Sequence, residues 1–257
     1  MPPRSYPTAR QRRLGAELRK LRERAGMSGG EAAAFLGGER AQISHIESGR
    51  YGVSDQRVRR LAAHYSANDK HLVDALAAMA EERTKGWWEE YRGVLSPGFL
   101  DLAELEHWAL SIRAIEMLYV PGIFQTEAYA TSLLRGGIAN LPTAELNARV
   151  EHRMRYCDAR TMSRQLEYLC ELSEWPSVTI RVIPFAAQIT GSVHSMAYAG
   201  ATIPALDTVQ VDSAFDSGFL DAEAQLAKYR ELIGSVDSIS LSEAKSNDFI
   251  QRIAQEM

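Results

Sequence analysis

The segment from Met27 to Gly52 constrains the fold of this chain more than any other part of it. Ser28 is followed three residues later by Glu31, and this capping box predicts the start of a short helix. The pair Gly37-Gly38 predicts a turn, and a second short helix follows over about residues 39–47, where another glycine ends it. The sequence therefore predicts two short helices that are joined by a glycine-containing turn.

Two short helices joined in this way are typical of a helix-turn-helix motif, whose second helix enters the major groove of DNA. Four apolar residues would hold the pair at a fixed angle: Ala33, Leu36, Ile43 and Ile46. Five outward residues would contact DNA: Arg40, Ala41, Gln42, Ser44 and His45. Arginine pairs with guanine and glutamine with adenine, whereas serine and histidine suit phosphates or base edges. Phosphate or solvent contacts are the alternative for the arginine, the glutamine and the histidine.

Two charged residues at the end of this helix are assigned different tasks. Arg50 is expected to hold a phosphate and so to fix the register on DNA, with an ion pair to Glu47 as the alternative. Glu47 is expected to be structural, because an acid near DNA is repelled unless it is paired. Its expected partner is Arg19 or Arg22.

The charges are unevenly distributed along the chain. Residues 1–65 carry 13 Lys and Arg against 6 Asp and Glu, a net charge of +7, whereas residues 66–257 carry 16 against 27, a net charge of −11. A basic N-terminal part on an acidic body favours a module that binds a polyanion. The arginines Arg10, Arg12 and Arg13 are expected either to reach DNA or to be solvated.

The rest of the chain predicts two domains. Further helices are expected over residues 10–25, 55–65 and 69–85, so that residues 1–80 form an all-α, five-helix domain. Residues 81–257 are expected to form an α+β domain with a small antiparallel sheet. Its helices are predicted over residues 100–116, 125–134, 143–160, 165–174, 221–233 and 242–255, and its strands over residues 178–185, 194–199 and 206–212.

Several of these motifs carry a resemblance to a known family. Ala25-Gly26-Met27-Ser28, Leu36-Gly37 and Ile43-Ser44-x-Ile46-Glu47-x-Gly49-Arg50 resemble the XRE type of helix-turn-helix, which is lambda-repressor-like. Four later motifs are similar to a C-terminal domain common in actinobacterial XRE regulators: Gly86-Trp87-Trp88, Leu95-Ser96-Pro97-Gly98-Phe99, Val120 to Ala130 and Val182-Ile183-Pro184-Phe185. The resemblance implies transcriptional control, often alongside a small acidic protein encoded nearby.

The sequence departs from this family in two places. Relatives usually have a glutamine that contacts the DNA backbone near the start of the first motif helix, where this chain has Gly29-Gly30. Ser28 and Gly29 remain DNA-binding candidates at that position. Relatives also have a longer segment, usually with a strand, between the positions of Arg160 and Met162; either it was lost or a stretch is missing from this sequence.

A group of aromatic residues in the second region has three interpretations. It forms core, lines a ligand pocket or presents a dimer or partner surface. The group comprises Trp87, Trp88, Tyr91, Trp108, Tyr119, Phe124 and Tyr129.

Other features of the sequence limit the classes of function that this chain can have. The two cysteines, Cys157 and Cys170, have no CxxC spacing, and the six histidines are scattered, so neither a disulfide framework nor a metal site is expected. His194-Ser195 with Asp212 or Asp216 lacks any nucleophile signature, and no cofactor and no enzyme activity are expected. No signal peptide and no membrane-spanning run is found, and we expect a cytoplasmic protein.

The sequence thus favours a sequence-specific transcriptional regulator that binds double-stranded DNA as a homodimer, because one such motif buries too little surface for tight binding. The second domain would supply dimerisation and signal or partner input. The alternative is an antitoxin-like protein that acts mainly through residues 87–257 on a small acidic partner.

Overall fold

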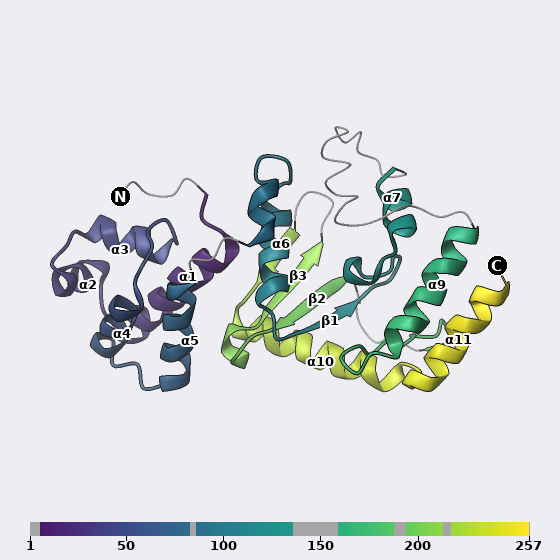
Figure 1. The fold of residues 1–257 in the computed structure, drawn as a ribbon. Coiled ribbons are helices and arrows are strands. Elements are labelled where there is room, and N and C mark those ends of the chain that lie inside the picture. Colours follow the sequence, from purple (N-terminus) through teal and green to yellow (C-terminus); the bar gives the residue numbers. More distant parts are fainter. Residues whose placement is uncertain (1–5, 83–85, 136–158, 188–193, 213–216, 257) are drawn as a thin grey trace. The chain divides into compact units, whose positions relative to one another are not determined.

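The computed structural model describes residues 6–82, 86–135, 159–187, 194–212 and 217–256 (Figure 1). The chain divides into two compact units. Unit 1 comprises Met1–Arg92, Ser96–Ile112 and Ala199–Asp221. Unit 2 comprises Gly93–Leu95, Arg113–Tyr198 and Ala222–Met257. The fold is the predicted one: helices alone in the N-terminal part, and helices with a small sheet after it.

Five helices form the N-terminal part of unit 1, at the positions that the sequence predicts. They are α1 (Ala9–Arg24), α2 (Gly29–Leu36), α3 (Arg40–Glu47), α4 (Asp55–His64) and α5 (Lys70–Glu81). The capping box at Ser28 is confirmed, since its hydroxyl accepts from the Glu31 N–H and its N–H donates to the Glu31 carboxylate. Gly37 ends α2 with a φ of 68°, a left-handed conformation that favours glycine.

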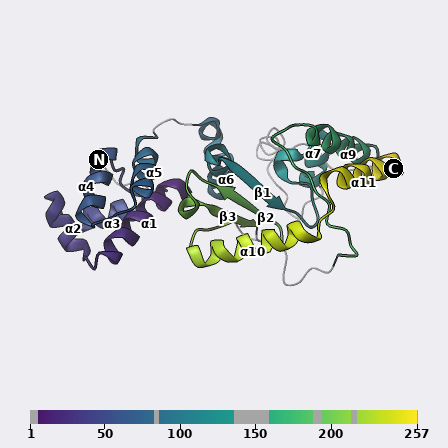
Figure 2. The same ribbon diagram turned by 90° about the horizontal axis from the view of Figure 1, so that it is seen from below.

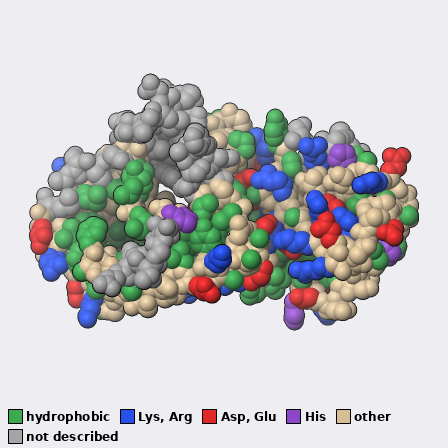
Figure 3. Space-filling view, turned by 180° about the vertical axis from the view of Figure 1, so that it is seen from behind, with side chains coloured by type: hydrophobic (Ala, Val, Ile, Leu, Met, Phe, Trp, Pro, Cys, Tyr) green, Lys and Arg blue, Asp and Glu red, His purple; other side chains and the backbone are tan. Residues whose placement is uncertain are grey.

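The apolar faces of these five helices meet in one core. Leu18, Ala32, Val58, Leu61 and Leu76 are at most 1% exposed. Phe35 lies outside this core, because its side chain is 37% exposed. It stacks on the His64 ring at 3.8 Å instead, with the Arg60 guanidinium above it. On the face drawn in Figure 3, where these helices lie on the right, Lys and Arg side chains are interspersed with Asp and Glu side chains.

Unit 1 also contains elements from later in the chain. They are η1 (Trp87–Tyr91), α6 (Pro97–Trp108), η3 (Pro204–Leu206), β3 (Thr208–Asp212) and β4 (Ser217–Leu220). Leu206 joins the core of the five N-terminal helices. β3 and β4 pair antiparallel, with Val209 opposite Leu220 and Val211 opposite Gly218. The sequence does not predict β4, because its four residues are too few for a recognisable alternation.

The sheet has four strands in the order β1-β2-β3-β4, where β1 is Ser111–Ile115 and β2 is Met196–Gly200. Strands β2 and β3 confirm the predictions for residues 194–199 and 206–212. The predicted helix over residues 100–116 is wrong in its second half, because α6 ends at Trp108 and β1 follows. The Leu110 N–H already donates to the Gly200 carbonyl, and this partner is 90 residues away, beyond the reach of local periodicity.

Unit 2 is mostly helical in the described residues. It contains η2 (Gly122–Phe124), α7 (Glu127–Arg135), α9 (Ala159–Ser173), α10 (Glu223–Ile239) and α11 (Glu243–Glu256). Figures 1 and 2 show α9 and α11 side by side, and the Ser163 hydroxyl donates to the Ala254 carbonyl. α9 passes through Arg160–Met162 without interruption. Most of the predicted helix 143–160 lies outside the described residues.

A buried glutamine joins two parts of unit 2. Gln165 of α9 is fully buried. Its amide oxygen accepts from the Thr126 N–H at 2.6 Å, and its amide nitrogen donates to the Phe124 carbonyl at 2.9 Å. One side chain thus satisfies a backbone N–H and a backbone carbonyl of this segment, and it positions η2 and the start of α7 against α9.

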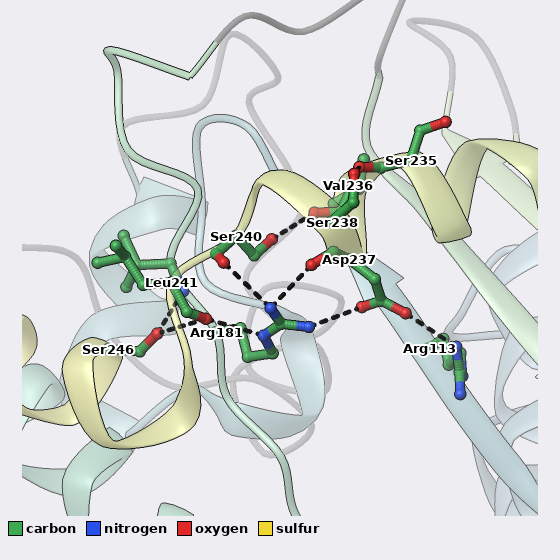
Figure 4. Close-up of polar contacts among 10 residues, drawn as sticks. Arg113, Arg181, Ser235, Val236, Asp237, Ser238, Ser240, Leu241 and Ser246 are labelled. Carbon is green, nitrogen blue, oxygen red and sulfur yellow. Dashed lines mark hydrogen bonds and ion pairs between the residues drawn. The ribbon is translucent and has the colours of Figure 1, made fainter.

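The predicted strand over residues 178–185 is wrong. The segment has no strand partner among the described residues, and other groups take its backbone bonds: the Ser246 hydroxyl accepts from the Val182 N–H, and the Val182 carbonyl accepts from the Leu241 N–H. Arg181 instead donates to three carbonyls at the end of α10, those of Asp237, Ser240 and Leu241 (Figure 4). The Asp237 carboxylate pairs with Arg181 and with Arg113. An arginine here suits the negative end of a helix dipole.

Candidate nucleic-acid interface

Helix α3 is held in place from two sides. Its inward residues Ile43 and Ile46 are 2% and 3% exposed, in the core that α1 and α2 share. On the other side α1 approaches the end of α3 closely, since a Cβ on Gly15 would lie 2.5 Å from the carbonyl oxygens of Ile46 and Glu47. A glycine is therefore required at position 15, and α1 sets the position of α3.

The outward residues of α3 face solvent. Arg40, Ala41, Ser44 and Arg50 are exposed, and Gln42 and His45 are half-buried. The structure brings most of these residues to the border of one hollow of about 530 Å³. Its lining consists of Gly38, Glu39, Ala41, Gln42, His45, Ile46, Arg50, Tyr51, Gly52 and Arg57. Tyr51 and Arg57 also line the hollow, although no sequence motif marks them as site residues. The nearest signal is the position of Arg57 in the capped first turn of α4.

Two side chains at this hollow pack against neighbouring residues. The Gln42 side chain folds back over Gly38, in a space that any larger residue at position 38 would fill. The His45 ring contacts the Tyr51 ring at 4.8 Å, and the Tyr51 N–H donates to the His45 carbonyl. Tyr51 therefore limits the directions in which the imidazole points.

Arg40 lies beside the start of α2. The nearest atoms to a Cβ on Gly29 would be those of the Arg40 side chain, at 3.8 Å. The Ser28 hydroxyl is engaged in the cap, whereas the backbone N–H groups of Gly29 and Gly30 begin the helix and have no intrahelical acceptor. Such N–H groups at a helix start bind anions. A guanidinium and the start of α2 thus lie next to each other.

The acid of α3 is paired internally, as the sequence predicts. The Glu47 carboxylate accepts from Arg22 Nε at 2.6 Å and from Nη2 at 2.9 Å, and both side chains are 11% exposed. This hydrogen-bonded carboxylate raises the pKa of Arg22. Burial and the nearby Glu47 charge raise the pKa of Tyr65 to about 12, against a smaller opposite effect of Arg22.

The alternative partner for Arg50 is thereby excluded. Glu47 is occupied by Arg22, and within the described part of the chain no carboxylate lies at ion-pair distance from Arg40, Arg50 or Arg57. Among the described residues these three cations therefore border the α3 face without an ion pair, although Glu39 also lines the hollow.

The arginines at the start of α1 are in the opposite state, because each of them pairs with an acid. The solvated alternative is wrong for Arg13, which is buried, whereas the Arg12 side chain is 50% exposed. Arg10 pairs with Glu82 at 2.5 Å, and Arg12 with Asp101 at 2.8 Å. Arg13 is 8% exposed and donates to the Ala205 carbonyl at 2.7 Å. Its acidic partners are Glu17 and Asp221.

The aromatic group is divided between the two units. Trp87, Trp88, Tyr91 and Trp108 belong to unit 1, and Tyr119, Phe124 and Tyr129 to unit 2. Trp88 and Tyr129 are buried, at 3% and 5%, whereas Trp87 and Tyr119 are 45% and 47% exposed. Trp108 lines a cavity of unit 1. The described residues contain no group of three or more His, Cys, Asp or Glu that is placed to hold a metal ion.

Comparison with known proteins gives two family matches. The model of a helix-turn-helix domain matches residues 13–76, which include all of α2 and α3. The model of a domain of unknown function, DUF5753, matches residues 99–156 and 153–252. No curated protein and no solved structure matches. None of the described helices combines the length and the apolar composition that a membrane span requires. The first match indicates a DNA-binding protein.

Proposed function

The chain belongs to the DUF5753 family, and on that premise we propose that this member is a sequence-specific transcriptional regulator that binds double-stranded DNA through α3. One observation carries the proposal. Arg40, Arg50 and Arg57 border the outward face of α3 with no acid at ion-pair distance in the described chain, while the acid of α3 is turned to Arg22. A cationic, solvent-facing helix of this size suits the major groove.

The residues divide into base readers and phosphate contacts. Arg40 and Gln42 reach base edges from the first turn of α3, with guanine and adenine as their preferred partners. Arg50 and Arg57 lie beyond its end and contact phosphates. The N–H groups that begin α2 at Gly29 receive a phosphate in place of the usual glutamine side chain.

The salt dependence of binding tests this arrangement. DNA fragments selected from a random pool by the full-length chain give the preferred site, and its affinity is then measured between 50 and 200 mM salt, a range over which about 6–10 phosphate contacts weaken binding 10³- to 10⁵-fold. We expect a steep fall for the selected site and for unrelated DNA. A selection that enriches no sequence, or an affinity independent of salt, would reject the proposal.

We further propose that the chain acts in the cytoplasm as a homodimer, without enzymatic activity or cofactor. Exposed apolar side chains around η2 in unit 2 support a protein contact: Met117, Leu118, Tyr119 and Ile123 are 47%, 81%, 47% and 48% exposed. Light scattering of the purified chain should give twice the monomer mass, and Leu118→Asp should halve it. A wild-type monomer would argue against dimerisation by the free protein.

The same exposed side chains favour a second candidate function, an antitoxin-like protein that binds a small partner through unit 2. Copurification with the protein encoded beside it in the chromosome distinguishes the two. A complex that Leu118→Asp abolishes, formed by a chain that selects no DNA sequence, would favour the second candidate over the regulator.

A further inference from the structure

Unit 1 contains a cavity that the DNA-binding residues do not use. Its volume is about 380 Å³, within the range of small-molecule sites. All of its lining residues belong to unit 1, and they come from α1, α5, α6 and the segment 199–221. The apolar part of the lining consists mainly of Met79, Leu105, Trp108, Ile203, Leu206 and Phe219. Such walls suit a ligand with an apolar body.

The charged residues of the lining are mostly neutralised within the protein. Arg59 pairs with Asp74, and Arg10 pairs with Glu82. Arg12 pairs with Asp101, and Arg13 with Asp221. These arginines are therefore already engaged, and an anionic ligand would have to compete with carboxylates that are fixed in place.

Glu104 of α6 is the exception among the carboxylates of the lining. It has no ion pair within the described chain, and its Oε2 atom is buried without a hydrogen-bond partner. A buried carboxylate oxygen without a donor is costly, so a cation or a donor from a ligand would be stabilising there. Burial, with the charge of Asp101 adding to it, raises the pKa of Glu104, against smaller opposite effects of hydrogen bonds from Thr8 and the Arg10 backbone and of the Arg10 charge.

We propose that this cavity binds a small molecule with one protonated amine and an apolar body, the amine at Glu104 and the body against Trp108 and Leu105. The ammonium donates a charge-assisted hydrogen bond to the free carboxylate oxygen. The apolar body gains from burial against the aromatic and aliphatic walls. The net charge of the lining, five carboxylates against two arginines, disfavours an anion.

The position of the cavity links the ligand to α3, and this step rests on the proposed function. Ala9, Arg10 and Arg13 of α1 line the cavity, and Gly15 of the same helix touches the end of α3. A ligand that shifts α1 would therefore shift the recognition helix, because no space separates Gly15 from the α3 backbone. The amine would change the affinity for DNA.

Calorimetry on the full-length chain without DNA tests the site. The probes are 4-phenylbutylamine, 4-phenylbutanol and 4-phenylbutyrate, which share one apolar body and differ in charge. We expect the amine to bind at least about tenfold more tightly than the alcohol, as one charge-assisted hydrogen bond allows, and the acid to bind most weakly. Equal affinities for amine and alcohol, or no binding of the amine at millimolar concentration, would overturn the proposal.

Three variants locate the site. Glu104→Gln should remove the preference for the amine and leave the alcohol unaffected, and Glu106→Gln, on the same helix but outside the lining, should change neither. Ala78→Phe should abolish binding of all three probes, because residue 78 is exposed at the cavity and a large side chain there fills it without entering the core. A preference that survives in Glu104→Gln, or binding that survives in Ala78→Phe, contradicts the proposal.

DNA affinity, measured with each probe present, separates the two proposals. If the chain binds the amine but selects no DNA sequence, the cavity proposal stands and the proposed function is rejected. If the chain selects a DNA sequence but does not bind the amine, only the cavity proposal is rejected. With both intact, the amine should change the DNA affinity and the alcohol should change it at least about tenfold less at equal concentration.

Discussion

Two groups of arginines in unit 1 carry the same charge in opposite surroundings. Those at the start of α1 are paired with acids, whereas those around α3 have no acid at ion-pair distance in the described chain. The first group is Arg10, Arg12 and Arg13, and the second is Arg40, Arg50 and Arg57. The positions of the acids, more than those of the arginines, therefore distinguish the proposed DNA-binding surface from the rest of unit 1. A net positive charge indicates that a polyanion is bound, and the internal pairs decide which cations remain for it.

Arg22 supports this difference, because it removes the acid of α3 from the surface. Arg22→Met should lower the free energy of unfolding by roughly 3–5 kcal/mol, since it leaves the Glu47 carboxylate buried and unpaired. Chemical denaturation of the full-length chain measures this loss. Adding Glu47→Gln to the variant should restore part of it, because no charge is then left unpaired.

The control is Arg19→Met, which removes an exposed arginine of the same helix whose partner Glu23 is also exposed. Its effect should be close to the limit of measurement. If Arg19→Met and Arg22→Met were equally harmful, the Glu47 pair would have no special place in the fold.

Tyr65 reports on the same pair through its pKa. The folded chain holds the phenol proton to about pH 12, above the ordinary value of 10 that applies after unfolding. The stability that this provides is complete below pH 10 and is lost as the pH rises from 10 to about 12, by about 2–3 kcal/mol. Tyr65→Phe should flatten this decline in the free energy of unfolding.

Tyr6→Phe is the matched control, because the Tyr6 side chain is 80% exposed. It should leave the decline between pH 10 and pH 12 as steep as in the wild type. An equally steep decline in Tyr65→Phe would show that another group titrates there.

Replacing Arg40 tests whether the second group of arginines includes a residue that recognises a base. Arg40→Ala should cost about 1–3 kcal/mol of binding free energy at one base pair and relax the preference there. Affinities for single-base variants of the selected site measure this. Arg59→Ala serves as the control, since Arg59 is paired with Asp55 and Asp74, and it should leave every affinity unchanged. An equal loss on all sequences would make Arg40 a phosphate contact.

The parts of this site that the sequence predicts are those that depend on near neighbours. Ser28 and Glu31 are three residues apart and cap α2, and Gly37 has the positive φ that its turn requires. The burial of Ile43 and Ile46 follows from helical spacing alone. The sequence also predicts a cationic partner for Glu47, because an acid at this position needs one, and Arg22 of α1 is that partner in the structure.

The parts that the sequence does not predict depend on residues far along the chain. Arg12 meets Asp101 across 89 residues, and Arg13 reaches the carbonyl of Ala205 across 192. No local pattern indicates such partners, so the sequence does not predict these two pairs. Strand β1 is not predicted for the same reason. Its residues Ser111–Ile115 suit a helix as well as a strand, and the hydrogen bond from Leu110 to the distant Gly200 carbonyl favours the strand.

The smallest expected effect compares one arginine from each group. Arg50→Ala should weaken DNA binding about fivefold at 0.15 M salt, equally on all sequences, and should reduce the slope of log affinity against log salt by about 1, because one phosphate contact is lost. Arg12→Ala removes the same charge but should leave the slope unchanged, since Arg12 already pairs with Asp101. Titrations at four salt concentrations measure both slopes. Equal changes in the two variants would show that charge alone, and not the placement of the acids, selects the arginines that meet DNA.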